Sequence, residues 1–175
     1  MKAFVGLGSN LGEREAMIRT ALEEMSRLPG TTLERASSLY DTEPVGDTDQ
    51  PNFLNAVAQL ETELPARQLL WNLLLIERRL GRVRTRRWGP RSIDLDLLLY
   101  DDLVLKMDEI ELPDPDISER PFLAIPLHEL SPDLTLPGQS LPIAAVAGRL
   151  SAAGMQPLPD FTELLRKENL SECLR

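Results

Sequence analysis

The chain has 175 residues with 42% hydrophobic content, and its 28 acidic and 19 basic residues give a formal net charge of -9. This length suits one domain, 1–175, and the acidic mean field opposes general adhesion to nucleic acid or to an anionic membrane. No apolar run reaches the roughly 18 to 20 residues of a membrane-spanning helix, and the lone Cys173 cannot form a disulfide within the chain, so a cytoplasmic protein is expected.

Hydrophobic spacing predicts short strands and two amphipathic helices over the first hundred residues. Strands are expected at 3–7, 32–39, 53–60 and 92–100, and helices at 11–28 and 65–80. Asn10, with Glu13 three residues later, is the predicted cap of the first helix. The order strand, helix, strand, strand, helix, strand predicts an α+β, ferredoxin-like split-βαβ sandwich, with helices packed on one face of a mainly antiparallel sheet.

The later segments are less regular. Residues 103–107 are expected to form a hairpin with strand 92–100 across Asp101 and Asp102. Short helices and turns are expected after Pro113, and a further helix near 143–150. The tail from about 157 to 175 contains an amphipathic segment to which no role is assigned.

Positive charge is concentrated in one short loop of this acidic chain. Between Arg78 and Ile93 the sequence has seven arginines and no acidic residue. One interpretation places them on a solvated helix face and on an ordinary loop. The alternative is that the arginines of residues 82–91 need an anion to offset their mutual repulsion. Guanidinium groups bind phosphate oxygens in a bidentate manner, so a polyphosphate is the predicted partner.

Two aspartates follow this loop. Asp94 and Asp96 are separated by one residue in an apolar strand, so their carboxylates point to the same side with Cα atoms roughly 6 to 7 Å apart. A divalent cation would offset their repulsion, and Mg²⁺ prefers carboxylate oxygens, water and substrate phosphates. Such a pair could also bridge two ions. The competing interpretation is a set of structural salt bridges with the neighbouring arginines, but the adjacent arginine loop favours a metal and a polyphosphate.

Three further features fit a ligand site. Phe53 and Asn55 lie on the predicted non-core face of the third strand, where a ring face and an amide suit a flat heteroaromatic ligand. Trp88, in the arginine loop, is either a lid over a ligand or an anchor for the loop. Glu77 can reach the same site or pair with an arginine.

Several motifs together resemble one enzyme family. Between about residues 5 and 137 the sequence contains, in order, GSNLG, TEPVG followed by DQPNFLNAV, GRVRTRRWGPRSIDLDLL and ERPFLAIPLHELSPDL. These are similar to the motifs of the 6-hydroxymethyl-7,8-dihydropterin pyrophosphokinases of folate biosynthesis. The resemblance implies a ferredoxin-like α+β fold, dependence on Mg²⁺, and transfer of the βγ-diphosphate of ATP to the pterin hydroxymethyl oxygen with release of AMP. The expected partners are ATP and the pterin, with no nucleic acid and no membrane, and a monomer is expected.

The resemblance also implies roles for individual residues. Two Mg²⁺ ions are expected at Asp94 and Asp96. Catalytic roles are implied for Arg82, Arg91 and Trp88. Contacts on the nucleotide side are implied for Glu77, Arg84, Arg91 and Arg120. Contacts with the pterin are implied for Thr42, Val45, Phe53, Asn55 and Phe122.

One position departs from the family pattern. The family usually has a histidine in a Pro-His-Pro sequence that contacts the nucleotide, whereas this chain has aspartate at position 114, between Pro113 and Pro115. A negative charge there is expected to weaken ATP binding. The departure also keeps open a pseudoenzyme that binds ATP and pterin without releasing AMP.

A binding module for RNA is the alternative from another class, because ferredoxin-like sheets with basic loops bind single strands on stacking aromatic residues. The acidic net charge and the 5% aromatic content disfavour this function.

Overall fold

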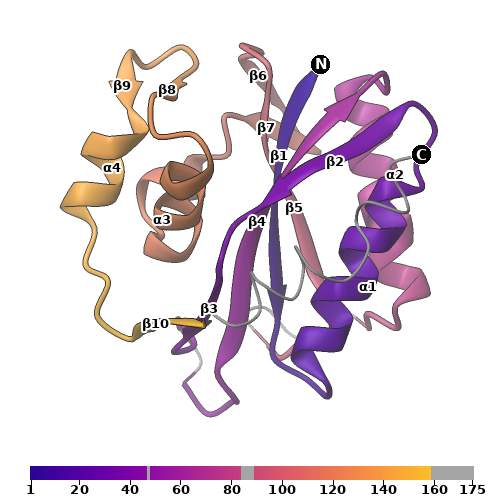
Figure 1. The fold of residues 1–175 in the computed structure, drawn as a ribbon, viewed down its shortest axis with the longest axis vertical. Coiled ribbons are helices and arrows are strands. Elements are labelled where there is room, and N and C mark those ends of the chain that lie inside the picture. Colours follow the sequence, from indigo (N-terminus) through magenta and orange to yellow (C-terminus); the bar gives the residue numbers. More distant parts are fainter. Residues whose placement is uncertain (47, 84–88, 159–175) are drawn as a thin grey trace.

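The computed structural model describes residues 1–46, 48–83 and 89–158, and a twisted sheet runs through its centre (Figure 1). The strands of this sheet are β1 (Lys2–Ser9), β2 (Thr31–Ala36), β3 (Leu39–Thr42), β4 (Phe53–Thr62), β5 (Asp94–Tyr100) and β10 (Met155–Leu158). Their order is β10-β3-β4-β1-β5, with β2 also paired to β4, and the pairs within the described residues are antiparallel. The predicted α+β class with an antiparallel sheet is confirmed.

The long strand β4 organises the sheet. It pairs with β1 along one side, and on the other side first with β3 and then with β2. The strand predicted at 32–39 is therefore two strands. Ser37 marks the break between them, where its amide donates to the Val57 carbonyl and its hydroxyl accepts from the Val57 amide, both at 2.9 Å.

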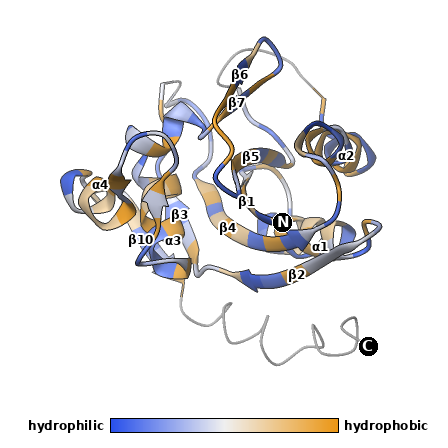
Figure 2. Cartoon of the chain, turned by 90° about the horizontal axis from the view of Figure 1, so that it is seen from above, coloured by the Kyte–Doolittle hydropathy of each residue, from blue (hydrophilic) through white to orange (hydrophobic). Residues whose placement is uncertain are grey.

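Helices cover both faces of the sheet, as Figures 1 and 2 show. On one face lie α1 (Arg14–Ser26) and α2 (Ala66–Arg79), and on the other α3 (Pro121–Leu130) and α4 (Ile143–Arg149). The expectation that helices pack on one face only is wrong. Its physical reason is that Phe4, Val57 and Leu98 place a second apolar cluster on the opposite face, which α3 and α4 bury.

A bulge alters the faces of β5. Leu95 and Leu97 point into the α1 and α2 core, as the alternating pattern predicts, but Leu99 belongs to the second core with Leu98. The register with β1 shifts between Phe4 and Val5, and this shift turns the end of β5 over.

The predicted hairpin after β5 is also wrong. Residues of β6 (Leu105–Met107) pair with β7 (Ile110–Leu112) rather than with β5. Asp101 has a left-handed φ of 43°, and its carboxylate accepts from the Lys2 amide at 2.6 Å, so the chain turns toward the start of β1. The 3-10 helix η1 (Pro115–Ser118), β8 (Thr135–Leu136) and β9 (Leu141–Pro142) complete the described part. None of the helices described is both long enough and apolar enough to span a bilayer.

Candidate active site

A cavity of about 500 Å³ lies between the sheet, α2, the β6–β7 hairpin and the start of α3. Two glycines of β1 form part of its wall. Gly8 pairs with Asn55 on β4 and with Asp94 on β5, while Gly6 pairs with Asp96. A Cβ atom on Gly8 would lie 2.8 Å from the Asn55 Oδ1, so only glycine leaves that amide in place. The glycines therefore let polar groups of β4 and β5 face one common space.

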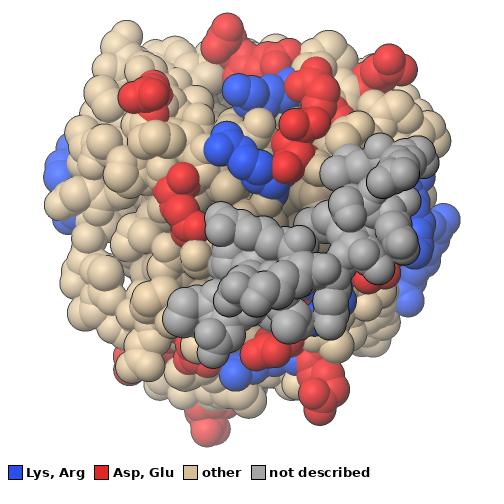
Figure 3. All heavy atoms as spheres, viewed as in Figure 1, with Lys and Arg blue, Asp and Glu red and all other residues tan. Residues whose placement is uncertain are grey.

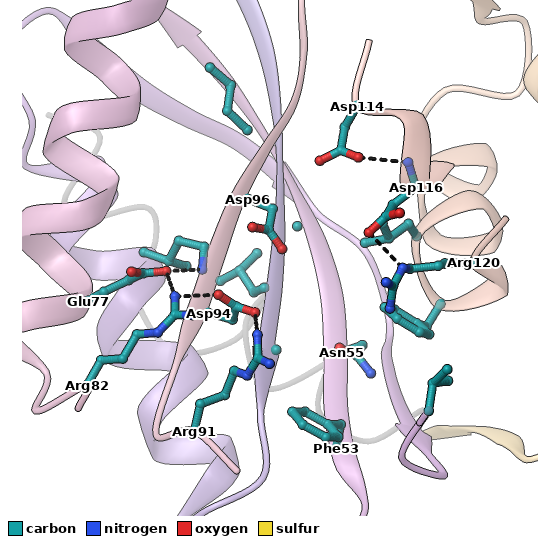
Figure 4. Close-up of a pocket in the computed structure, with 18 of the residues that line it drawn as sticks. Phe53, Asn55, Glu77, Arg82, Arg91, Asp94, Asp96, Asp114, Asp116 and Arg120 are labelled. Carbon is teal, nitrogen blue, oxygen red and sulfur yellow. Dashed lines mark hydrogen bonds and ion pairs between the residues drawn. The ribbon is translucent and has the colours of Figure 1, made fainter. Parts of the chain in front are cut away.

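One side of the cavity is a compact group of charges. The two oxygens of Asp94 accept hydrogen bonds from Arg82 and Arg91, one from each (Figure 4). Arg82 also donates to Glu77, whose carboxylate accepts from the Leu95 amide at 2.8 Å. The Glu77 side chain is only 3% exposed, so Arg82 neutralises a buried charge. The salt-bridge interpretation thus describes Asp94 in this structure.

Asp96 differs from Asp94. Its side chain opens onto the cavity, and within the described residues no hydrogen bond or ion pair engages its carboxylate. The pKa of Asp96 is raised to about 8. Desolvation by the surrounding protein is the largest cause, and the negative charges of Asp94, Asp114 and Glu77 follow. At neutral pH the Asp96 carboxyl is therefore mostly protonated, and a cation bound at this corner would favour its charged form by taking the place of the proton.

The donor set suits Mg²⁺ if the substrate completes it. Asp94 and Asp96 offer hard carboxylate oxygens on one face of one strand, and an ionised carboxylate has lone pairs left after accepting two hydrogen bonds. In the part of the chain that the structure describes, no three acidic, His or Cys side chains gather closely enough to hold a metal alone. Mg²⁺ does not need such a group, because it keeps waters and takes phosphate oxygens besides one or two carboxylates.

The other side of the cavity combines aromatic rings with an amide. Phe53 and Asn55 come from β4, and the Asn55 Nδ2 donates to the Thr42 hydroxyl at 2.5 Å. The Phe122 ring lines the cavity from the start of α3. Each ring has a guanidinium nearby, with the Arg91 Cζ 6.0 Å from the Phe53 centroid and the Arg120 Cζ 5.7 Å from that of Phe122. Arg91 therefore contacts both sides of the cavity.

Asp114 faces the cavity opposite β5 (Figure 4). Its Oδ1 accepts from the Asp116 amide at 2.8 Å and caps η1, and Asp116 in turn forms an ion pair with Arg120 at 2.7 Å. Burial is the main cause that raises the pKa of Asp114 to about 6. At neutral pH its carboxylate is therefore mostly charged.

An apolar wall of the cavity was not predicted. Leu70 and Leu74 of α2 and Ile110 of the β6–β7 hairpin line it. In the sequence Leu70 and Leu74 belong to the apolar stripe of a helix, and such a stripe does not distinguish core from ligand contact. An ion pair between Arg67 of α2 and Glu109 of the hairpin connects the two elements at this end.

The cavity brings together the predicted site residues that the structure describes. These are Thr42, Val45, Phe53, Asn55, Glu77, Arg82, Arg91, Asp94, Asp96, Arg120 and Phe122. Arg84 and Trp88 lie outside the described residues. The role of each residue toward a ligand stays a prediction.

Replacing Asp114 by asparagine is expected to stabilise the fold at neutral pH. Because its pKa rises from 3.8 to about 6 on folding, the folded state keeps a proton between these values that the unfolded state loses. The charge of Asp114 therefore lowers the free energy of unfolding. This effect is absent below the unfolded pKa, grows as pH rises, and is complete above the folded pKa. Because Asp114 is partly exposed and solvent screens its charge, we expect Asp114→Asn to raise the free energy of unfolding at neutral pH by on the order of 2 kcal/mol. Urea unfolding of both proteins in EDTA from pH 4 to pH 8 would measure it, and parallel pH curves would contradict it.

The fold and the cavity define a class, namely an α+β protein in which one site joins a charged half, rich in arginines and carboxylates, to an aromatic half. Residues 4–132 match the family model of 7,8-dihydro-6-hydroxymethylpterin-pyrophosphokinase, and the chain belongs to this family of pyrophosphokinases.

Relatives of this chain include 2-amino-4-hydroxy-6-hydroxymethyldihydropteridine pyrophosphokinases from two bacteria. The protein of Methylorubrum extorquens is 41% identical over 155 residues, which cover 89% of this chain and 97% of that protein. The protein of Pseudomonas aeruginosa is 45% identical over 142 residues, which cover 81% and 88%.

A crystal structure of wild-type HPPK-DHPS from Plasmodium falciparum has a similar fold, with a TM-score of 0.67 at 13% identity over 85% of this chain and 41% of that one. The chain thus spans less than half of this structural neighbour, and the likeness concerns the fold alone.

Proposed function

We propose that this enzyme transfers the diphosphate group of ATP to 6-hydroxymethyl-7,8-dihydropterin, with Mg²⁺, and forms AMP and the pterin diphosphate for folate biosynthesis. The observation that carries the proposal is the junction of the two halves of the cavity. Arg91 pairs with Asp94 and also lies near the Phe53 ring. A polyphosphate among the arginines would thus lie next to a flat acceptor among the rings.

The acceptor half suits a pterin. We expect the pterin ring between Phe53 and Phe122, because two aromatic faces suit a flat heterocycle. The buried Asn55 would bind its polar edge, together with Thr42 and the backbone near the exposed Val45.

The nucleotide half suits ATP. The apolar wall of Leu70, Leu74 and Ile110 offers a surface for the adenine base. Arg82, Arg91 and Arg120 would contact phosphates, with Arg84 as a further predicted contact and Glu77 holding Arg82 in place.

Asp94 and Asp96 are the residues that would hold Mg²⁺, with two ions expected. When bound, the ions would neutralise phosphate charge and orient the phosphates for displacement. The arginines that now neutralise Asp94 would then share the phosphates with the metal.

In the transfer, the hydroxymethyl oxygen forms a bond to the β-phosphorus while the bond from that phosphorus to the α–β bridging oxygen breaks. AMP leaves and the hydroxyl proton is released. We assign no general base. The chain's residues would act mainly by aligning the two substrates and by offsetting charge on the transferred group, which are the dominant contributions in phosphoryl-type transfer. A loop carrying Trp88 is expected to close over both substrates.

The test is a reaction of the purified protein with MgATP in the presence and absence of the pterin, followed by separation of the nucleotides. We expect AMP, rather than ADP, only when the pterin is present. ADP formation would contradict diphosphate transfer. Binding of ATP and pterin without any AMP would instead support the pseudoenzyme.

Asp114→His is expected to lower the KM for ATP about fivefold. The change removes a carboxylate from a cavity that would hold phosphates, and a like-charge interaction at such a distance is worth about 1 kcal/mol at high effective dielectric. Steady-state kinetics at neutral pH measure it. Asp114→Asn removes the charge without adding an imidazole, so equal effects would assign the gain to charge alone. An unchanged or raised KM in both variants would overturn the prediction.

We infer further that the chain acts as a cytoplasmic monomer of one domain on small molecules. Basic side chains lie among acidic ones on the face shown in Figure 3, rather than in a continuous basic surface. This disfavours RNA on that face. The strand order β5-β1-β4, with β2 and β3 both paired to the far side of β4, supports the ferredoxin-like description. Light scattering of the purified chain would test the monomer.

A further inference from the structure

A polar cluster lies behind the aromatic half of the cavity. Arg14, the first residue of α1, donates through Nη1 to the Asp41 Oδ2 at 3.1 Å and to the Asn52 carbonyl at 2.7 Å. The Asn52 Nδ2 donates to the other Asp41 oxygen at 2.7 Å. None of the three residues lines the cavity. Both carboxylate oxygens of Asp41 are thus engaged within the cluster.

The cluster connects the two ends of the loop between β3 and β4. Asp41 precedes Thr42, and Asn52 precedes Phe53, and Thr42 and Phe53 are partners across the two strands. These partners line the cavity, whereas Asp41 is opposite Leu54, which belongs to the core on the α1 side. Arg14 therefore holds the loop from the back of the sheet.

The charge of Arg14 is poorly placed for the helix itself. A cation at a helix N-terminus opposes the macrodipole, typically by about 0.3–1 kcal/mol. The helix has Glu13 before it and no side-chain cap. Its contacts with Asp41 and Asn52, which tie α1 to the loop, account for an arginine there. The Arg14 and Asp41 side chains are 31% and 26% exposed, so solvent screens this pair only in part.

Asn10 holds the same loop in a different way. Its Nδ2 donates to the Gln50 Oε1 and to the Pro51 carbonyl, both at 3.0 Å, and its Oδ1 accepts from the Arg91 amide at 2.8 Å. Asn10 is therefore not the cap of α1 that the sequence predicts, because its amide bonds to Gln50, Pro51 and Arg91 instead. Asn10 thus links this loop to the backbone of Arg91, whereas the side-chain hydrogen bonds of Arg14 within the described residues go to the acceptor side.

We propose that Arg14 is a positioning residue for the acceptor half of the site and acts through Asp41 and Asn52. The proposal rests on the proposed function, because the acceptor is the pterin. Without Arg14 the loop end would sample more conformations. Only the fraction with Thr42 and Phe53 in place would bind the pterin, and the apparent affinity falls by that fraction. Within the described residues, the hydrogen bonds and the ion pair of the cluster do not involve the arginines and carboxylates of the nucleotide half.

The experiment compares Arg14→Met with the wild-type enzyme. We expect the KM for the pterin to rise about tenfold, while kcat at saturating pterin and the KM for ATP change less than about twofold. Arg27→Met is the control, because Arg27 directly follows the last residue of the same helix and, within the described residues, forms its ion pairs with Glu23 and Glu24 rather than with the loop. The proposal would be overturned if Arg14→Met lowered kcat by as large a factor as it raised the KM for the pterin. It would also be overturned if the pterin KM of Arg14→Met were the same as that of Arg27→Met.

A double-mutant cycle separates positioning from general destabilisation. Asp41→Asn alone should raise the pterin KM, and adding Arg14→Met to it should raise it little further, because both changes remove one interaction. Arg14→Lys should restore part of the affinity, since lysine keeps the positive charge but lacks the planar guanidinium group. Additive effects, or no recovery with lysine, would count against the role of this cluster.

Hydrogen exchange gives a readout that does not depend on activity. Arg14→Met should speed exchange in a peptide covering residues 48–53 and leave that of β5 unchanged. If wild type makes no AMP with the pterin, the proposed function fails whatever the exchange shows. If wild type is active and neither exchange nor pterin KM responds to Arg14→Met, the positioning role alone fails.

Discussion

Asp96→Asn is expected to lower the rate of diphosphate transfer by about three orders of magnitude, the scale seen when one preorganised charge contact is removed from a transition state. Asp96 is the carboxylate of the pair that has no partner within the described residues, so it is the one most available to a metal ion. Asparagine has nearly the same shape but is a neutral and much poorer ligand. The fold should be kept and, as for Asp114, should gain stability at neutral pH, because the change removes a carboxyl whose pKa is raised on folding and loses no hydrogen bond or ion pair within the described residues.

Single-turnover rates of AMP formation measure this effect, and Mg²⁺ titration of the protein with a non-hydrolysable ATP analogue measures the metal. Asp102→Asn is the control, because Asp102 is an exposed residue in the turn after β5. We expect the control to react like wild type. A rate within tenfold of wild type for Asp96→Asn, with unaltered Mg²⁺ binding, would remove Asp96 from the metal site.

Local patterns predicted most of the sheet and the first two helices. Strands with alternating or continuous apolar residues, such as 53–60, and the stripes of α1 and α2 are local features, and the structure has elements there. The faces of these elements were harder to predict. Val57 fits a solvent-facing position by alternation, but it is 0% exposed because α3 and α4 cover that side. Of these two helices, α3 comes from a Pro-rich segment where periodicity carries little information, and α4 is predicted near 143–150 without any sign of the face that it covers.

For the site, too, the sequence predicts local features but not contacts between distant residues. Spacing alone predicts that Asp94 and Asp96 share a face, and motif resemblance supplied Arg120 and Phe122, which are distant in the chain. Spacing cannot say that Asp94 is paired with two arginines and Asp96 with none of the described residues, because that depends on how Arg82 and Arg91 approach β5 in three dimensions. The first strand contains a pattern that could have located the site from the sequence, namely glycines two residues apart at positions 6 and 8. Glycines spaced by two in a buried strand indicate that something approaches one face closely.

Arg82→Met is expected to reduce both stability and transfer, for two different reasons. Arg82 is only 14% exposed and donates to both Glu77 and Asp94, so its loss leaves a buried carboxylate without a counterion. Removing one partner of a buried ion pair costs about 3–5 kcal/mol of the free energy of unfolding. If Arg82 also contacts the transferred phosphates, the transfer rate should fall by about two orders of magnitude.

A second substitution in the same chain separates the two effects. In Glu77→Gln with Arg82→Met, the amide oxygen at position 77 can still accept from the Leu95 amide, but no buried charge is left unpaired there. Urea unfolding should therefore show a large part of the stability restored, while single-turnover AMP formation should stay as slow as in Arg82→Met. If the rate recovers together with the stability, Arg82 acts only by neutralising Glu77. Stability regained without rate would place its guanidinium on the reacting phosphates, because restoring the surrounding fold does not replace a lost contact with the transferred charge.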